Sequence, residues 1–127
     1  MTIAYWCVLI AGLLPYVAIG IAKWDRTYDN RDPRTWAEKI EGRQKRAHNA
    51  HLNGFEAFPL FAAGVIIAHL AHAPQAILDA LAMVFIAARL TYLWMYVANK
   101  AYLRSLAWVV GLGASLALFF IAAATKV

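Results

Sequence analysis

Long apolar runs alternate with short polar segments along this chain. Four runs hold about twenty residues each, which at about 1.5 Å per residue suffices to cross a hydrocarbon core about 30 Å thick. We predict membrane-spanning helices over residues 3–22, 47–71, 76–98 and 106–125. The pattern therefore predicts an all-α integral membrane protein, a four-helix bundle with antiparallel up-down topology and a single domain over residues 1–127.

The one long polar segment, residues 23–46, lies between the first two spans and carries eight Lys/Arg and five Asp/Glu. Within it, Asp32 is placed to cap a helix whose first residue is Pro33. We therefore predict a short helix from Pro33 to about Glu41. A solvated loop of mixed charge is the alternative.

Composition and charge agree with a membrane location. The chain is 63% apolar and has a net charge of +5, and its basic residues gather in the loops beside the spans. Residues 23–46 and the turn 99–104 hold ten Lys/Arg, whereas the loop between the second and third spans holds none. The positive-inside rule then predicts that both basic loops are cytoplasmic and both termini are not. This distribution argues against nucleic acid as a partner.

Two of the spans carry a polar stripe. Because a helix turns by about 100° per residue, residues three or four apart share a face. The stripe on the second span holds Arg46, Asn49, Asn53 and Glu56. The stripe on the third span holds Arg89, Tyr92, Tyr96 and Asn99.

Glu56 and Arg89 lie at similar depths in their spans, about ten residues or about 15 Å from the cytoplasmic end. An ionised side chain in the bilayer centre costs at least about 2.5–3.5 kcal/mol, so each must find a partner. We expect the two to pair inside the bundle. A structural pair that binds no ligand is the alternative.

Arg104 and Ser105 stand where the fourth span begins. A helix N-terminus beside an arginine creates a positive field that suits an anion such as a thiolate. Arg104 as a simple positive-inside flank is the alternative. Two H-x-x-H pairs, at positions 48/51 and 69/72, lie at opposite ends of the second span and supply too few ligands each, so we predict no metal site.

Three segments together carry a resemblance to a known family. RAHNAHLNGFEAFPLF, RLTYLWMY and LRSLAW occur in this order, and they resemble the MAPEG family of membrane-associated proteins in eicosanoid and glutathione metabolism. The resemblance covers nearly the whole chain. It implies a homotrimer of four-helix protomers, with glutathione bound between neighbouring protomers near the cytoplasmic face.

The resemblance also implies roles for individual residues in holding glutathione. Asn53 and Glu56 would hold the polar backbone and the amine. Tyr92 and Tyr96 would hydrogen-bond the peptide, and Arg89 would pair with Glu56 or with a ligand carboxylate.

For catalysis, the resemblance implies that Arg104, with Ser105 beside it, stabilises the thiolate. One position departs from the family pattern, because Asn49 stands where an arginine is usual, four residues before Asn53. We expect Arg46, one turn earlier on the same face, to reach the ligand in its place.

The resulting expectation is a glutathione-dependent membrane transferase or peroxidase. It would act by thiolate activation on lipophilic small molecules, electrophiles that enter from the lipid bilayer. Two alternatives from other classes remain: a non-catalytic lipid-binding or scaffolding protein of the same fold, and a small proton-coupled transporter that uses Glu56.

Overall fold

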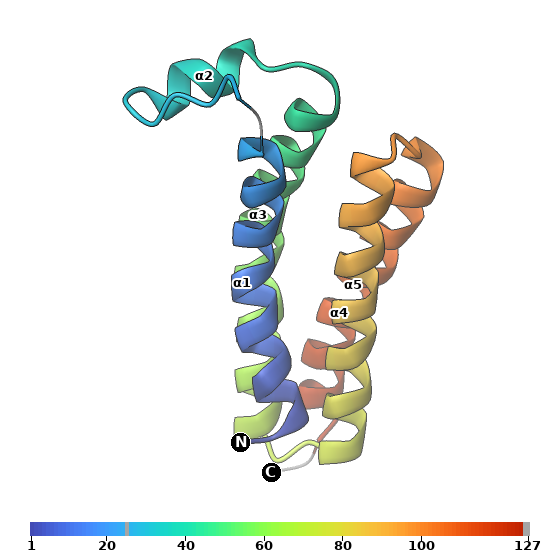
Figure 1. Cartoon of the computed structure of the whole chain (residues 1–127). Helices are drawn as coiled ribbons and strands as arrows, with labels where there is room; N and C mark the ends of the chain where they lie inside the picture. The colour runs from blue at the N-terminus through green and yellow to red at the C-terminus, as the bar shows by residue number, and fades with distance from the viewer. Residues whose placement is uncertain (25, 126–127) are drawn as a thin grey trace.

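The computed structural model describes residues 1–24 and 26–125, and every regular element in this part of the chain is a helix. The helices are α1 (Ile3–Lys23), α2 (Pro33–Lys39), α3 (Gly42–Leu70), α4 (Gln75–Val97) and α5 (Ala101–Ala124). The four long helices run side by side, while α2 lies across one end of the bundle, and the start of α1 and the end of α5 lie at the other end (Figure 1). Each long helix is long and apolar enough to cross a membrane. The predicted all-α four-helix membrane bundle is confirmed.

Mostly small side chains form the inner face of α1. The buried positions of α1 recur every three or four residues: Ala4, Cys7, Ala11, Pro15, Ala18 and Ala22. Small residues let helix backbones approach closely, which is how membrane helices pack without a hydrophobic driving force between them. Large apolar side chains such as Leu13, Trp94 and Phe120 point outward instead. A surface of this kind is suited to contact with lipid.

Helices α1 and α3 approach each other closely at Gly54. A Cβ atom added there would lie 2.9 Å from Cγ of Pro15, a buried residue of α1. Only a residue without a side chain lets the two helices meet at this distance. Since Gly54 directly follows Asn53 in α3, this contact helps to fix the height and rotation of the polar stripe.

Helix α2 forms as its local sequence predicts. Asp32 is the N-cap, Pro33 occupies the first turn, and Asp32 Oδ1 accepts a hydrogen bond from the Thr35 amide at 3.2 Å. Hydrogen bonding by Thr35 lowers the pKa of Asp32. The buried side chain of Trp36 packs in one cluster with Ala22 of α1 and Ala47 of α3, which holds α2 across the bundle end.

Helices α3 and α4 end in the same way, with a residue in the left-handed conformation. His72 has φ 58° and Asn99 has φ 62°. After α4, the Lys100 amide donates back to the Met95 carbonyl at 2.8 Å, as in a Schellman motif. The chain therefore reverses within a few residues, and α5 begins at Ala101, five residues before the predicted start of the fourth span.

Asp79 of α4 joins the helices at the opposite end of the bundle. Its Oδ1 accepts hydrogen bonds from the Ala4 amide at 2.9 Å and from Gln75 Nε2 at 2.7 Å. The first amides of a helix have no partner inside that helix. The carboxylate thus caps α1 from a neighbouring helix and gives this intramembrane acid a structural role.

Candidate functional site

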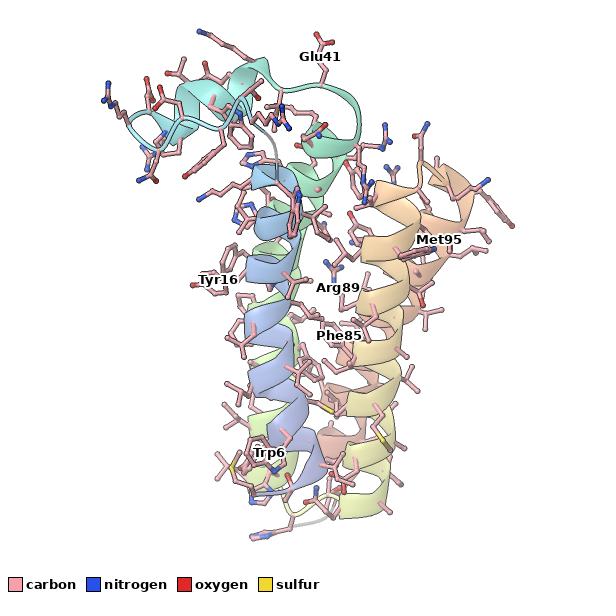
Figure 2. All side chains as sticks on the ribbon, viewed as in Figure 1. Trp6, Tyr16, Glu41, Phe85, Arg89 and Met95 are labelled. Carbon is pink, nitrogen blue, oxygen red and sulfur yellow. The ribbon has the colours of Figure 1, made fainter. Side chains whose placement is uncertain are left out.

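The two polar stripes meet between α3 and α4. Arg89 is only 8% exposed, and Figure 2 shows its side chain projecting from α4 into the interior of the bundle. Its Nη1 donates to Asn53 Oδ1 at 2.9 Å, and its guanidinium carbon lies 4.3 Å from the centre of the Tyr92 ring. A neutral amide and an aromatic face therefore stabilise this buried charge.

Glu56 does not pair directly with Arg89, so that expectation is wrong. Glu56 is exposed, and its Oε2 accepts a long hydrogen bond of 3.5 Å from Asn53 Nδ2. Asn53 lies between the two charges, because its Oδ1 accepts from Arg89 of α4 and its Nδ2 donates to Glu56, one turn further along α3. Among the described residues, Arg89 has no carboxylate partner.

A hollow of ≈ 450 Å³ lies beside this network, and we call it the polar hollow. It is lined by Asn53, Tyr92, Tyr96, Arg104, Ser105, Trp108 and Val109. Five of the predicted site residues, which come from three helices, thus line the same hollow. The volume falls in the range of about 300–1,000 Å³ that is usual for small-molecule sites.

Arg104 is held in the polar hollow by an aromatic ring. Its guanidinium carbon lies 4.6 Å from the centre of the Tyr96 ring. The Arg104 amide already donates to the Lys100 carbonyl at 2.9 Å, because α5 begins five residues before the expected position. The amides without a partner inside α5 therefore belong to the residues that precede Arg104. We infer that the positive field at the polar hollow comes mainly from the Arg104 guanidinium.

The Ser105 hydroxyl donates to the Ala101 carbonyl of its own helix at 3.1 Å. This bond uses the hydroxyl hydrogen, while the oxygen can still accept a hydrogen bond. Ser105 is therefore placed at the wall of the polar hollow as an acceptor.

Arg46 lies outside the polar hollow. Its Nε and Nη2 donate to the Val97 carbonyl at 3.3 and 3.2 Å. An arginine at this place satisfies a carbonyl that the helix end leaves free and interacts favourably with the negative end of α4. Arg46 thus joins α3 to α4. Its expected contact with a ligand stays a prediction.

Trp108 is a site residue that the sequence interpretation missed. It lines the polar hollow and a second hollow of ≈ 180 Å³ further into the bundle, which we call the deep hollow. The deep hollow is lined by Asn53, Glu56, Ala57, Leu60, Phe85, Arg89, Trp108, Gly111, Leu112 and Ser115. The signal was available, because Trp108 follows Arg104 by four residues and so shares its helix face.

No curated protein matches the chain. Its sequence does match the model of the MAPEG family over residues 3–124, nearly its whole length. The match agrees with the four membrane-spanning helices and with the order of the polar segments along the chain. The chain therefore belongs to the MAPEG family.

Proposed function

We propose that this protein is a glutathione-dependent membrane transferase or peroxidase that acts on lipophilic electrophiles. The observation that carries the proposal is the convergence of Asn53, Tyr92, Tyr96 and Arg104 on one hollow, with the buried charge of Arg89 bonded directly behind it. Family membership is consistent with this chemistry at the level of glutathione and eicosanoid metabolism.

The residues of the site match the groups that glutathione presents. Glutathione has two carboxylates, one ammonium and one thiol. Arg89 and Arg104 supply positive charge for the anionic groups, and Glu56 supplies the one carboxylate that lines either hollow among the residues that the structure describes. The Tyr92 and Tyr96 side chains add hydroxyl groups that can donate or accept hydrogen bonds.

Glutathione would supply the sulfur nucleophile, which forms a bond to the electrophilic carbon as the leaving group departs with its electron pair. Arg104 would stabilise the negative charge on that sulfur, since thiolates form readily beside a guanidinium. Asn53 and Arg89 would fix the peptide by binding a carboxylate. Ser105 would accept a hydrogen bond at the wall of the polar hollow.

The deep hollow would hold the apolar part of the second substrate. Its walls include Leu60, Phe85 and Leu112, and it adjoins the polar hollow at Asn53 and Trp108. A lipophilic molecule in the deep hollow would present its reactive end near the level of Trp108. This arrangement favours substrates that partition into the bilayer.

The proposed protein is a homotrimer with glutathione bound between neighbouring protomers, as the family resemblance implies. Native mass spectrometry of the protein released from detergent micelles measures the number of chains directly. A mass of three chains is the expected result. A monomer that still binds glutathione would remove the trimer from the proposal and leave the binding residues in place.

We also propose that α2 and its flanking loops are cytoplasmic and both termini are not, because the basic residues gather at the α2 end. The test uses Cys7→Ser protein carrying either Asp29→Cys or Pro74→Cys, at two exposed loop positions. A membrane-impermeant maleimide should label the Pro74 variant in intact cells and the Asp29 variant only after lysis. The reverse labelling pattern would overturn the orientation.

The experiment that tests the activity is a titration of purified protein in lipid nanodiscs with glutathione. It is followed by a conjugation assay with a chromogenic electrophile. We expect saturable binding in the micromolar to millimolar range and a conjugation rate above that of empty nanodiscs. Asn53→Ala should weaken the binding, because it leaves Arg89 without its hydrogen-bond acceptor.

Absence of glutathione binding at millimolar concentration would overturn the proposal in favour of a lipid-binding protein without catalysis. Two observations speak for that second candidate. Asn49 replaces an arginine that the family usually has, and Arg46 is engaged at the end of α4. Among the described residues, the positive charges that line the two hollows are therefore those of Arg89 and Arg104.

A further inference from the structure

A small cavity lies in the interior of the bundle, between α1, α3 and α4. Its volume is ≈ 20 Å³, and every residue that lines it is buried or half-buried. Ala11, Pro15 and Ala18 of α1 and Arg89 of α4 are among these residues, and we call the space the proline cavity. The proposed glutathione chemistry gives this cavity no role.

Pro15 removes a hydrogen-bond donor from α1 at the wall of the proline cavity. Proline has no amide hydrogen, so the Ala11 carbonyl, one turn earlier in α1, lacks the donor that an α-helix normally supplies. Both residues are buried, and both line the cavity. In membrane helices, neighbouring groups or ordered water satisfy a carbonyl that a proline leaves free. The proline cavity therefore adjoins a carbonyl that can accept a hydrogen bond.

Arg89 brings hydrogen-bond donors to the same cavity. A guanidinium has five N–H groups. Within the described part of the chain, Nη1 donates to Asn53 Oδ1 at 2.9 Å, and the Nε and Nη2 atoms of Arg89 have no recorded acceptor. The side chain is 8% exposed, and buried polar groups are nearly always hydrogen-bonded. An acceptor for the remaining donors is therefore expected beside the guanidinium.

We propose that the proline cavity holds one water molecule, which accepts hydrogen bonds from Arg89 and donates one to the Ala11 carbonyl. A cavity needs about 10–15 Å³ to hold a water molecule, so a volume of ≈ 20 Å³ has room for one. A buried water typically forms about two to four hydrogen bonds, and these two residues supply enough partners. An apolar occupant would leave the donors and the carbonyl without partners, and a larger polar occupant would not fit.

The water would anchor Arg89 from α1, as Asn53 anchors it from α3. Asn53 Oδ1 holds Nη1, and the water would hold the other side of the guanidinium beside Pro15. Contacts with two neighbouring helices would then determine the position of one buried charge of α4. Because the cavity lies inside the bundle, the water would be present with or without glutathione.

A crystal structure of the protein grown in a lipidic phase tests the site directly. At a resolution that shows ordered water, we expect solvent density within about 2.7–3.2 Å of an Arg89 nitrogen and of the Ala11 carbonyl oxygen. A map that shows other ordered waters but no density in the proline cavity would overturn the proposal.

Two variants of similar shape at Ala18 test the water through its effect on stability. Ala18 lines the cavity and is 2% exposed, so Ala18→Val and Ala18→Thr would each displace the water. Threonine alone provides an oxygen that can accept from Arg89. We expect Ala18→Thr to melt about 5–10 °C above Ala18→Val, from the usual effect of a hydrogen bond to a charged group.

A dry cavity predicts the opposite order, because valine fills apolar space without burying a hydroxyl. Thermal denaturation in detergent, followed by circular dichroism, measures the order. An Ala18→Val protein that is as stable as Ala18→Thr, or more stable, would overturn the proposal.

The same two substitutions at Ala122 are the matched control. Ala122 is half-buried against the apolar core and lies outside the proline cavity. There the valine variant should be at least as stable as the threonine variant. A higher stability of the threonine variant at both positions would show a general preference for threonine in these helices, and would overturn the proposal.

Arg89→Met tests whether the effect at Ala18 depends on the guanidinium. This substitution removes the donors, so in its background Ala18→Val should be at least as stable as Ala18→Thr. If threonine remained the better residue without Arg89, its hydroxyl would act through another group, and a water bound by Arg89 would be ruled out.

Discussion

Replacing Asn53 by alanine tests the central contact of the candidate site. Asn53 Oδ1 is the hydrogen-bond acceptor of Arg89, whose side chain is 8% exposed. Removing the Asn53 amide leaves the buried Arg89 guanidinium without a hydrogen-bond acceptor at Nη1. Hydrogen bonds to charged groups typically contribute about 1.5–3 kcal/mol, and we expect Asn53→Ala to lower the free energy of unfolding by about that amount.

The comparison with Arg89→Met makes the prediction specific. Methionine keeps much of the side-chain volume and removes the buried charge, so this single variant should be nearly neutral. Once the charge is absent, Asn53→Ala should have little further effect. The Asn53–Arg89 coupling energy from the double-mutant cycle should therefore be about 1.5–3 kcal/mol.

A second cycle uses Glu56→Gln with Arg89→Met. Glu56 is exposed, and its hydrogen-bond partner among the described residues is Asn53, at 3.5 Å, so its coupling to Arg89 should stay within about 0.5 kcal/mol. Both cycles are measured as free energies of unfolding, by SDS titration in phosphocholine micelles followed by circular dichroism. A Glu56–Arg89 coupling larger than the Asn53–Arg89 coupling would show a direct ion pair and refute the arrangement described above.

Three further predictions rest on single positions. Gly54→Ala should destabilise the bundle by about 1–3 kcal/mol through overpacking against α1. The control Gly20→Ala should not, because a Cβ added there meets nothing within 4 Å. Equal effects of the two variants in thermal denaturation would contradict the close contact at Gly54. His72→Gly should raise the melting temperature, because φ is 58° there, and a lower value would contradict it. Arg104→Ala should reduce kcat about 100-fold while glutathione affinity changes little; a loss of affinity alone in steady-state kinetics and titration would make Arg104 a binding residue.

Features that depend on residues close together in the sequence were predictable from the sequence. The four spans follow from hydropathy and length, and the Asp32–Pro33 helix start follows from capping chemistry. The helical period also placed Asn53 and Tyr92 on inward faces. These inferences need only the geometry of a single helix, which the local sequence determines.

Features that depend on contacts between distant segments were not predictable in the same way. Arg46 bonds a carbonyl 51 residues away, and nothing near Arg46 in the sequence indicates Val97 as its partner. Helical spacing gives the direction of a side chain but not its distance from the facing helix. For this reason the stripes suggested a Glu56–Arg89 pair, although Asn53 is the residue that reaches Arg89.

The way the two arginines are held bears directly on the ligand. Arg89 is stabilised by an amide oxygen and the Tyr92 ring, and Arg104 by the Tyr96 ring, so all of their recorded partners are neutral. Neutral partners reduce the cost of burying a cation and leave its charge unneutralised. A carboxylate partner would have cancelled that charge and weakened the attraction for an anion. Stabilisation by rings and an amide therefore keeps the site folded and still attractive to a ligand with carboxylate and thiolate groups.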